Sequence, residues 1–185
     1  YGKRPVEYLD SIGFLNKNVL AAHCVWLDDS EIDIIAKRGV GVSHCIESNL
    51  KLASGIAPIV KMIKNGVKVS FGTDGAASNN DLSLLSEMST AAKVHKVIAK
   101  DPTALDSKTV VLMATRWAAE ILGLGKKLGS INKGKYADII MINLKKPHLT
   151  PIYDIYSHIV YAMADSDIET VFINGKIVIN NRKLV

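Results

Sequence analysis

Three side chains that can do acid–base or metal chemistry stand at comparable places in three successive apolar segments. His23, His44 and Asp74 each lie at or near the carboxyl end of such a segment. Imidazole serves as an acid, a base or a metal ligand near neutral pH. An ionised carboxylate after an apolar segment is costly to bury unless a metal, hydrogen bonds or a cation compensate for it. Asp74 is therefore the best candidate for a metal ligand or a general base.

Asp74 also has a structural interpretation, because aspartate often accepts backbone N–H groups at turns. It stands directly before the polar segment GAASNN, which it could cap. GAASNN offers Ser78 to a substrate, and the segment SNLKLASG offers Ser48, Asn49 or Lys51. Both segments are equally typical of ordinary polar turns.

The two histidines belong to repeated His-Cys dipeptides, which invite a zinc site with two imidazoles and two thiolates. Adjacent strand residues point to opposite faces, however. If both histidines face the interior of a barrel, Cys24 and Cys45 face the outer helices and are small packing residues. A histidine on a strand can also be an ordinary core residue. Two cysteines outside any CxxC pair do not form a secreted disulfide framework.

Alternating strands and helices must position these side chains. The apolar segments predict strands over Asn18–Val25, Val40–Cys45 and Lys68–Asp74. The predicted helices are Pro5–Ile12, a helix capped by Asp29-Ser30 and ended by Gly39, Ile56–Asn65, about Leu82–Ala99 and about Ser107–Leu122. This order indicates a parallel α/β sheet or barrel, whose catalytic residues gather at the carboxyl ends of the strands.

The pattern changes after Gly123. Strands are predicted over Tyr136–Asn143 and Ile168–Ile173, and Asn174-Gly175 is a strong two-residue hairpin turn into KIVIN. Lys145, Lys146, His148 and His158 lie in this terminal region and are interpreted as surface or packing residues.

Composition excludes several classes of protein. The 185 residues are 48% hydrophobic and 22% charged, which is ordinary for a globular protein. The net charge is +5, but the lysines are scattered, so we expect no nucleic-acid partner. The sequence predicts neither a membrane span nor a signal segment, and a cytoplasmic location is expected. Because Tyr1 stands where a methionine would, we expect a missing front half.

Three blocks, AAHCVWLDDSEI, SHCIESNLKLASGIAPI and FGTDGAASNNDLSLLSEM, resemble the amidohydrolase superfamily. The resemblance is greatest to its methylthioadenosine/S-adenosylhomocysteine deaminases, including 5′-deoxyadenosine deaminases, and extends to the tail segments GSINKGKYADIIMINL and VFINGKIVI. It implies an α/β fold: the carboxy-terminal part, strands 6–8 with their helices, of a metal-dependent (β/α)8 TIM barrel over residues 1–126. A small portion of the family's β-sandwich would follow over residues 127–185.

The resemblance also implies an activity. The family hydrolytically deaminates an adenosine-type nucleoside, such as 5′-methylthioadenosine, S-adenosylhomocysteine, 5′-deoxyadenosine or adenosine, and releases ammonia. One divalent metal ion, zinc or iron, activates the water. Asp74 matches the strand-eight aspartate that binds the metal and moves the proton, and His23 matches the strand-six histidine that assists catalysis. His44 matches the strand-seven position and, with Ser78, is assigned to substrate binding.

The chain departs from the family pattern in two respects. The family's His-x-His motif and its strand-five histidine with a glutamate three residues later do not occur here, and would lie upstream of Tyr1. Cys45-Ile46-Glu47 stands where the family usually has Asn-Pro or Cys-Pro, which adds a carboxylate beside the pocket. We therefore expect weak metal retention and no activity from this chain alone, which would need a missing amino-terminal half or a homo-oligomer.

Two alternatives remain at this stage. One is a non-catalytic half-barrel that assembles through its exposed strand edges. The other is a fragment of a related chlorohydrolase or guanine-type deaminase.

Overall fold

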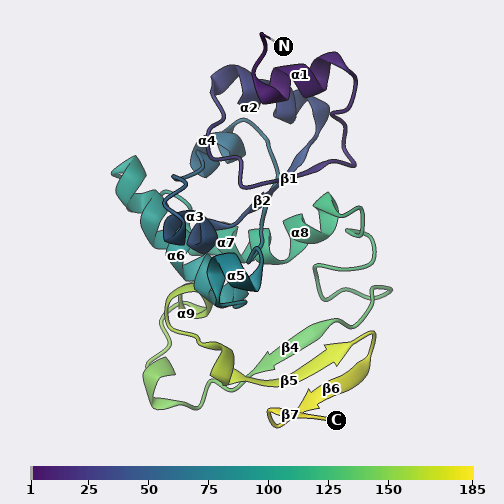
Figure 1. Ribbon diagram of the computed structural model, residues 1–185. Helices are drawn as coiled ribbons and strands as arrows, with labels where there is room; N and C mark the ends of the chain where they lie inside the picture. The colour runs from purple at the N-terminus through teal and green to yellow at the C-terminus, as the bar shows by residue number, and fades with distance from the viewer. Residues whose placement is uncertain (1) are drawn as a thin grey trace.

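The computed structural model describes residues 2–185 and contains a parallel sheet and an antiparallel sheet (Figure 1). The elements are α1 (Pro5–Ser11), β1 (Leu20–Ala22), α2 (Asp29–Arg38), β2 (Gly41–His44), α3 (Ile46–Lys51), α4 (Ile59–Lys64), β3 (Val69–Phe71), α5 (Ala76–Asn79), α6 (Leu84–Ala99), α7 (Ser107–Ala114), α8 (Arg116–Ile121), β4 (Ile139–Ile142), η1 (Pro147–Leu149), α9 (Ile155–Tyr161), η2 (Asp165–Asp167), β5 (Ile168–Ile173), β6 (Lys176–Asn180) and β7 (Lys183–Leu184). Figure 1 shows α1 and α2 at one end of the molecule, the antiparallel sheet at the other, and α6, α7 and α9 between them. No helix in the described part of the chain is long and apolar enough to cross a lipid bilayer.

The parallel sheet has the order β1-β2-β3, which confirms the predicted strand–helix alternation. Its register pairs Ala22 with Ser43 and His44 with Phe71, so the carboxyl ends of the three strands meet at one edge. All of β3 is buried, and the sheet shares one apolar core with α2, α4, α6 and α7. β1 is an edge strand on which Leu20 is 45% exposed.

Helix α2 forms where its end signals predict, although a different residue caps it. The Asp28 side chain, rather than Asp29-Ser30, accepts the backbone N–H of Glu31. Gly39 ends the helix with a left-handed φ of 69°. Ile32 and Ile35 are buried against the sheet, because residues three apart share one face of a helix.

Three local predictions were wrong. SNLKLASG contains most of α3 rather than a loop, and GAASNN contains α5; tertiary contacts, not an apolar periodicity, stabilise these short helices. The helix predicted over residues 107–122 is broken at Thr115, where φ is −128° and ψ is −89°. The Thr115 hydroxyl donates to the Val111 carbonyl oxygen, a local bond that competes with the helix.

The antiparallel sheet has the order β4-β5-β6-β7, and β5 has the predicted bounds. Asn174 and Gly175 both have positive φ, 49° and 77°, as a two-residue turn requires, so the hairpin prediction is confirmed. Buried Asp167 accepts hydrogen bonds from Lys146 Nζ at 2.8 Å and His148 Nε2 at 2.9 Å. These contacts fasten the segment after β4 to the start of β5.

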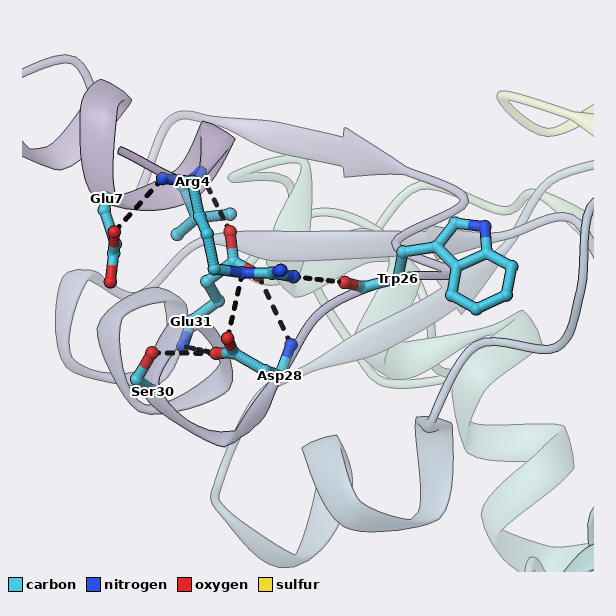
Figure 2. Close-up of polar contacts among 7 residues, drawn as sticks. Arg4, Glu7, Trp26, Asp28, Ser30 and Glu31 are labelled. Carbon is cyan, nitrogen blue, oxygen red and sulfur yellow. Dashed lines mark hydrogen bonds and ion pairs between the residues drawn. The ribbon is translucent and has the colours of Figure 1, made fainter. Parts of the chain in front are cut away.

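Arg4 fastens α1 to α2 and to the loop that follows β1. Figure 2 shows its guanidinium between the Trp26 carbonyl oxygen and the carboxylates of Asp28 and Glu31. The Nη2 atom is 2.7 Å from Trp26 O and 2.7 Å from Glu31 Oε2. Glu31 is only 1% exposed, so Arg4 neutralises a carboxylate that water cannot solvate.

We predict that Arg4→Met lowers the melting temperature more than Arg38→Met does. Both arginines join α1 to α2, but the Arg38 partner, Asp10, remains partly exposed. Removing Arg4 leaves the buried carboxylate of Glu31 without its cationic partner, whereas removing Arg38 leaves the Asp10 carboxylate, which water can solvate. The check is thermal unfolding of the two variants of the natural gene product that contains this chain. Equal losses would contradict the role given to the burial of Glu31.

Candidate active site

His23 and Asp74 lie just beyond the strands that were predicted to contain them. β1 ends at Ala22 and β3 ends at Phe71, so both predicted strands were too long. His23 has a φ of 65°, Cys24 of 52° and Asp74 of 59°. This left-handed region is uncommon for residues other than glycine, and such strained positions cluster at functional sites. The backbone therefore turns sharply at both positions, at the carboxyl edge of the sheet.

Asn49 fixes the orientation and the proton of the His23 ring. The His23 Nδ1 atom is 2.8 Å from Asn49 Oδ1. Because an amide oxygen can only accept, this bond places the proton on Nδ1 and leaves a lone pair on Nε2. Asn49 is 2% exposed, and its Nδ2 has no hydrogen-bond partner among residues 2–185.

Hydrogen bonds keep Asp74 ionised. Ser48 Oγ donates to Asp74 Oδ2 at 2.7 Å, and the Gly75 amide donates to Oδ1 at 2.8 Å. The hydroxyls of Ser48 and Ser78 and the Gly75 amide lower the pKa of Asp74 to about 2. The side chain is 32% exposed, so the carboxylate remains accessible from solvent.

The two reactive groups face each other across a short gap. His23 Nε2 lies 3.9 Å from Asp74 Oδ2. That separation is too long for a direct hydrogen bond, yet one oxygen atom can lie within hydrogen-bond distance of both groups. A carboxylate and an imidazole lone pair both accept protons, so the pair can hold and deprotonate a water molecule.

The metal-binding capacity of these residues is incomplete. No group of three or more histidine, cysteine, aspartate or glutamate side chains gathers at metal-binding distances within residues 2–185. Catalytic zinc generally uses three protein ligands. Asp74 and His23 can supply part of such a set, and a complete zinc site would need at least one further ligand that residues 2–185 do not place beside them.

His44 lies in the core, where it contacts a second histidine. It is fully buried, and its Nε2 is 3.0 Å from Nε2 of His95 on α6. Burial lowers the pKa of His44 to about 3 and that of His95 to about 4, so both rings are neutral. His44 faces α6 instead of the interior of a barrel, which was the condition set for it above. A Cβ on Gly72 would meet the side chains of Ser43 and Cys45, so these two lie on one face of the sheet and the His44 ring lies on the other.

The serine and asparagine side chains that were predicted to contact a substrate lie beside Asp74 and His23. The Ser78 hydroxyl donates to the Gly75 carbonyl oxygen at 2.9 Å, in the loop that follows Asp74. Ser48 and Asn49, weighed only as substrate contacts, hold Asp74 and His23 in place. The signal for them was their position, because both lie in α3, the segment that follows the strand ending at His44.

Known proteins similar to this chain belong to one family, and they are longer than the chain. The model of the amidohydrolase family matches residues 1–178. A 5-methylthioadenosine/S-adenosylhomocysteine deaminase of Thermodesulfovibrio yellowstonii is 66% identical over 180 residues, which are 97% of this chain and 41% of that protein. A 5′-deoxyadenosine deaminase of Methanosarcina barkeri is 51% identical over 185 residues, 100% of this chain and 42% of that protein.

A solved structure has the same fold over the whole chain. The crystal structure of an adenosine deaminase from Xanthomonas campestris with bound zinc superposes with a TM-score of 0.97 and 42% sequence identity. The superposition covers 100% of this chain and 42% of that structure. This chain therefore spans about two fifths of the length of the proteins it matches.

Proposed function

Because the chain belongs to the amidohydrolase family, we propose that it forms part of an enzyme that removes the amino group of an adenosine-type nucleoside by hydrolysis. The substrate class is 5′-methylthioadenosine, S-adenosylhomocysteine, 5′-deoxyadenosine or adenosine. Water replaces the amino group on the purine ring, and ammonia leaves. The names of two relatives and of the Xanthomonas structure support this class.

The observation that carries the proposal is the facing pair of His23 and Asp74 at the carboxyl edge of the parallel sheet. Asp74 is ionised; it takes a proton of the attacking water and passes it to the amino group, which leaves as ammonia. The second proton of the water moves to the adjacent ring nitrogen. His23, with its Nε2 lone pair directed to the same side, accepts a hydrogen bond from that water and so orients it for attack on the purine carbon. Ser78 stays a proposed substrate contact. The buried position of His44 favours a structural role over substrate contact.

The fold context of this pair is also a proposal. Residues 1–126 would form strands 6–8 of a (β/α)8 barrel with their helices, and residues 127–185 a portion of the β-sandwich. The rest of the barrel would pair with the exposed edge strand β1. A missing amino-terminal half or another chain would supply it.

A divalent metal, zinc or iron, belongs to the complete site. When bound, it would lower the pKa of a water molecule towards neutrality. Asp74 is the residue of this chain that would hold it, with His23 beside it. Zinc in the Xanthomonas structure supports a divalent metal in this fold.

We expect the natural gene product to release ammonia from at least one of the four nucleosides and to contain a divalent metal. The measurement combines elemental analysis of the purified protein with an ammonia-release assay on each nucleoside, with guanine as the comparison substrate. Release of ammonia from guanine alone would favour a guanine-type deaminase. No release from any of them would refute the proposed activity.

A further inference from the structure

One buried carboxyl group lies beneath both halves of the candidate site. Glu87 on α6 has no exposed surface. Its Oε2 accepts the backbone N–H of Glu47 at 3.3 Å, in the first turn of α3. Its Oε1 accepts Nδ2 of Asn79, at the end of α5, at 2.9 Å. The two oxygens of one side chain thus join two separate segments.

The first of these segments carries the residues that hold the reactive pair. Glu47 is followed directly by Ser48, which donates to Asp74, and by Asn49, which orients His23. The Glu47 N–H that donates to Glu87 therefore holds the first turn of α3 directly before these two residues. Thr90, one turn along α6 from Glu87, donates to the Glu47 carboxylate at 2.8 Å and ties the same turn a second time.

The second segment carries Asp74 itself. Asn79 Nδ2 donates both to Glu87 and to the Thr73 carbonyl oxygen, at 2.8 Å, next to Asp74. Because an amide nitrogen has two protons, both donors are used and the Asn79 side chain is fixed. Asn79 is 8% exposed, so water does not compete for these bonds. A continuous chain of contacts therefore runs from α6 to the backbone beside Asp74.

Burying the Glu87 carboxyl costs free energy of folding. Burial, with the nearby Glu47 carboxylate, raises the pKa of Glu87 to about 7, although backbone and Asn79 hydrogen bonds oppose the shift. A leucine or methionine at this helix position would pack without that cost. The buried carboxyl lies where it joins two segments that meet at the reactive pair.

We propose that Glu87 is a positioning residue, which sets the His23–Asp74 geometry by holding α3 and the Asp74 loop in fixed relation. The catalytic part of this inference rests on the proposed deaminase function. Residues that orient the groups around a reactive centre typically change activity by about 10–100-fold when removed. Glu87 reaches neither reactive group directly, so its loss should lower kcat through disorder of the pair.

The test uses Glu87→Ala and Glu87→Gln in the natural gene product, with Asp167→Ala as the control. Asp167 is also a buried carboxylate with several donors, but it lies in the terminal β region. We expect kcat of Glu87→Ala to fall by about 10–100-fold. Glu87→Gln, which keeps one acceptor oxygen, should recover part of the loss. Asp167→Ala should lower the melting temperature without changing kcat at temperatures where it stays folded.

Amide hydrogen exchange supplies a readout that does not depend on activity. Residues 46–51 and 73–80 should exchange faster together in both Glu87 variants and remain unchanged in Asp167→Ala. Unchanged exchange in these segments, or a kcat within about 2-fold of the natural protein, would overturn the proposal. If Glu87→Ala does not fold, Glu87→Gln is judged by the same criteria. If the natural protein deaminates none of the nucleosides, the deaminase function fails, and hydrogen exchange alone decides whether Glu87 holds the two segments.

Discussion

Replacing Asp74 with asparagine is expected to lower kcat for ammonia release by the natural gene product by about 10²–10⁴-fold, the range typical for loss of a general acid–base group. Asparagine preserves the shape and can still accept from Ser48, so the change removes the charge rather than the packing. The same variant should retain less of its divalent metal, because the carboxylate is this chain's proposed ligand. Steady-state kinetics and elemental analysis of the same preparation measure both effects.

Asp81→Asn is the matched control for this substitution. Asp81 accepts a backbone N–H from Ser83 and a hydroxyl from Ser86, a pattern like that at Asp74. Within residues 2–185, however, Asp81 has no histidine at ion-pair distance, whereas Asp74 has His23. We expect Asp81→Asn to leave kcat within about 3-fold, since surface changes of this kind have small effects. If the two variants lost activity equally, hydrogen bonding rather than chemistry would explain Asp74.

The pH profile of the natural protein gives the same hypothesis a second check. The pKa of Asp74 is lowered to about 2, so the carboxylate is ionised at every pH above about 4. Protonation of Asp74 should therefore cause no loss of kcat between pH 5 and pH 8. Suppose instead that the natural protein loses activity on acidification in that range and that this pH dependence disappears only in Asp74→Asn. The pKa of the Asp74 carboxyl would then be much higher than its hydrogen bonds imply.

Replacing His23 with glutamine is expected to have the second-largest effect, again about 10²–10⁴-fold in kcat. Glutamine can reach a similar position, but it has no basic nitrogen to share a proton. Asn49→Leu should cause a smaller loss, about 10–100-fold, because it removes the acceptor that orients the ring and keeps the proton on Nδ1 but leaves the imidazole itself present. Kinetic assays of both variants under identical conditions test the order of these effects.

Asn65→Leu is the control for the orienting role of Asn49. Asn65 donates to Asp33 on the surface, away from the reactive pair, so its loss should not alter kcat. If Asn49→Leu matched the control, or if it lost more activity than His23→Gln, the tautomer assigned to His23 would be wrong.

Much of the fold could be predicted from local patterns. The apolar segments located all three parallel strands. β3 is wholly buried and β2 nearly so, whereas β1 is mostly exposed and was located by the same apolar pattern. Gly39 and the Asn174-Gly175 pair marked a helix end and a hairpin, because each needs a positive φ. The break at Thr115 could not be predicted, since the apolar pattern continues through it from α7 into α8.

The sequence by itself determined the family, the order of elements and the candidate pair of His23 and Asp74, because residue type and position along the chain carry that information. Only the tertiary structure decided which side chains surround the pair. Ser48, Asn49 and Glu87 lie far from their partners along the chain, so no spacing rule connects them. The facing of His44 was likewise decided by packing, because α6 places His95 against one face of the sheet. The sequence determines which residue stands at the end of each strand, whereas tertiary packing determines which side chains that residue contacts.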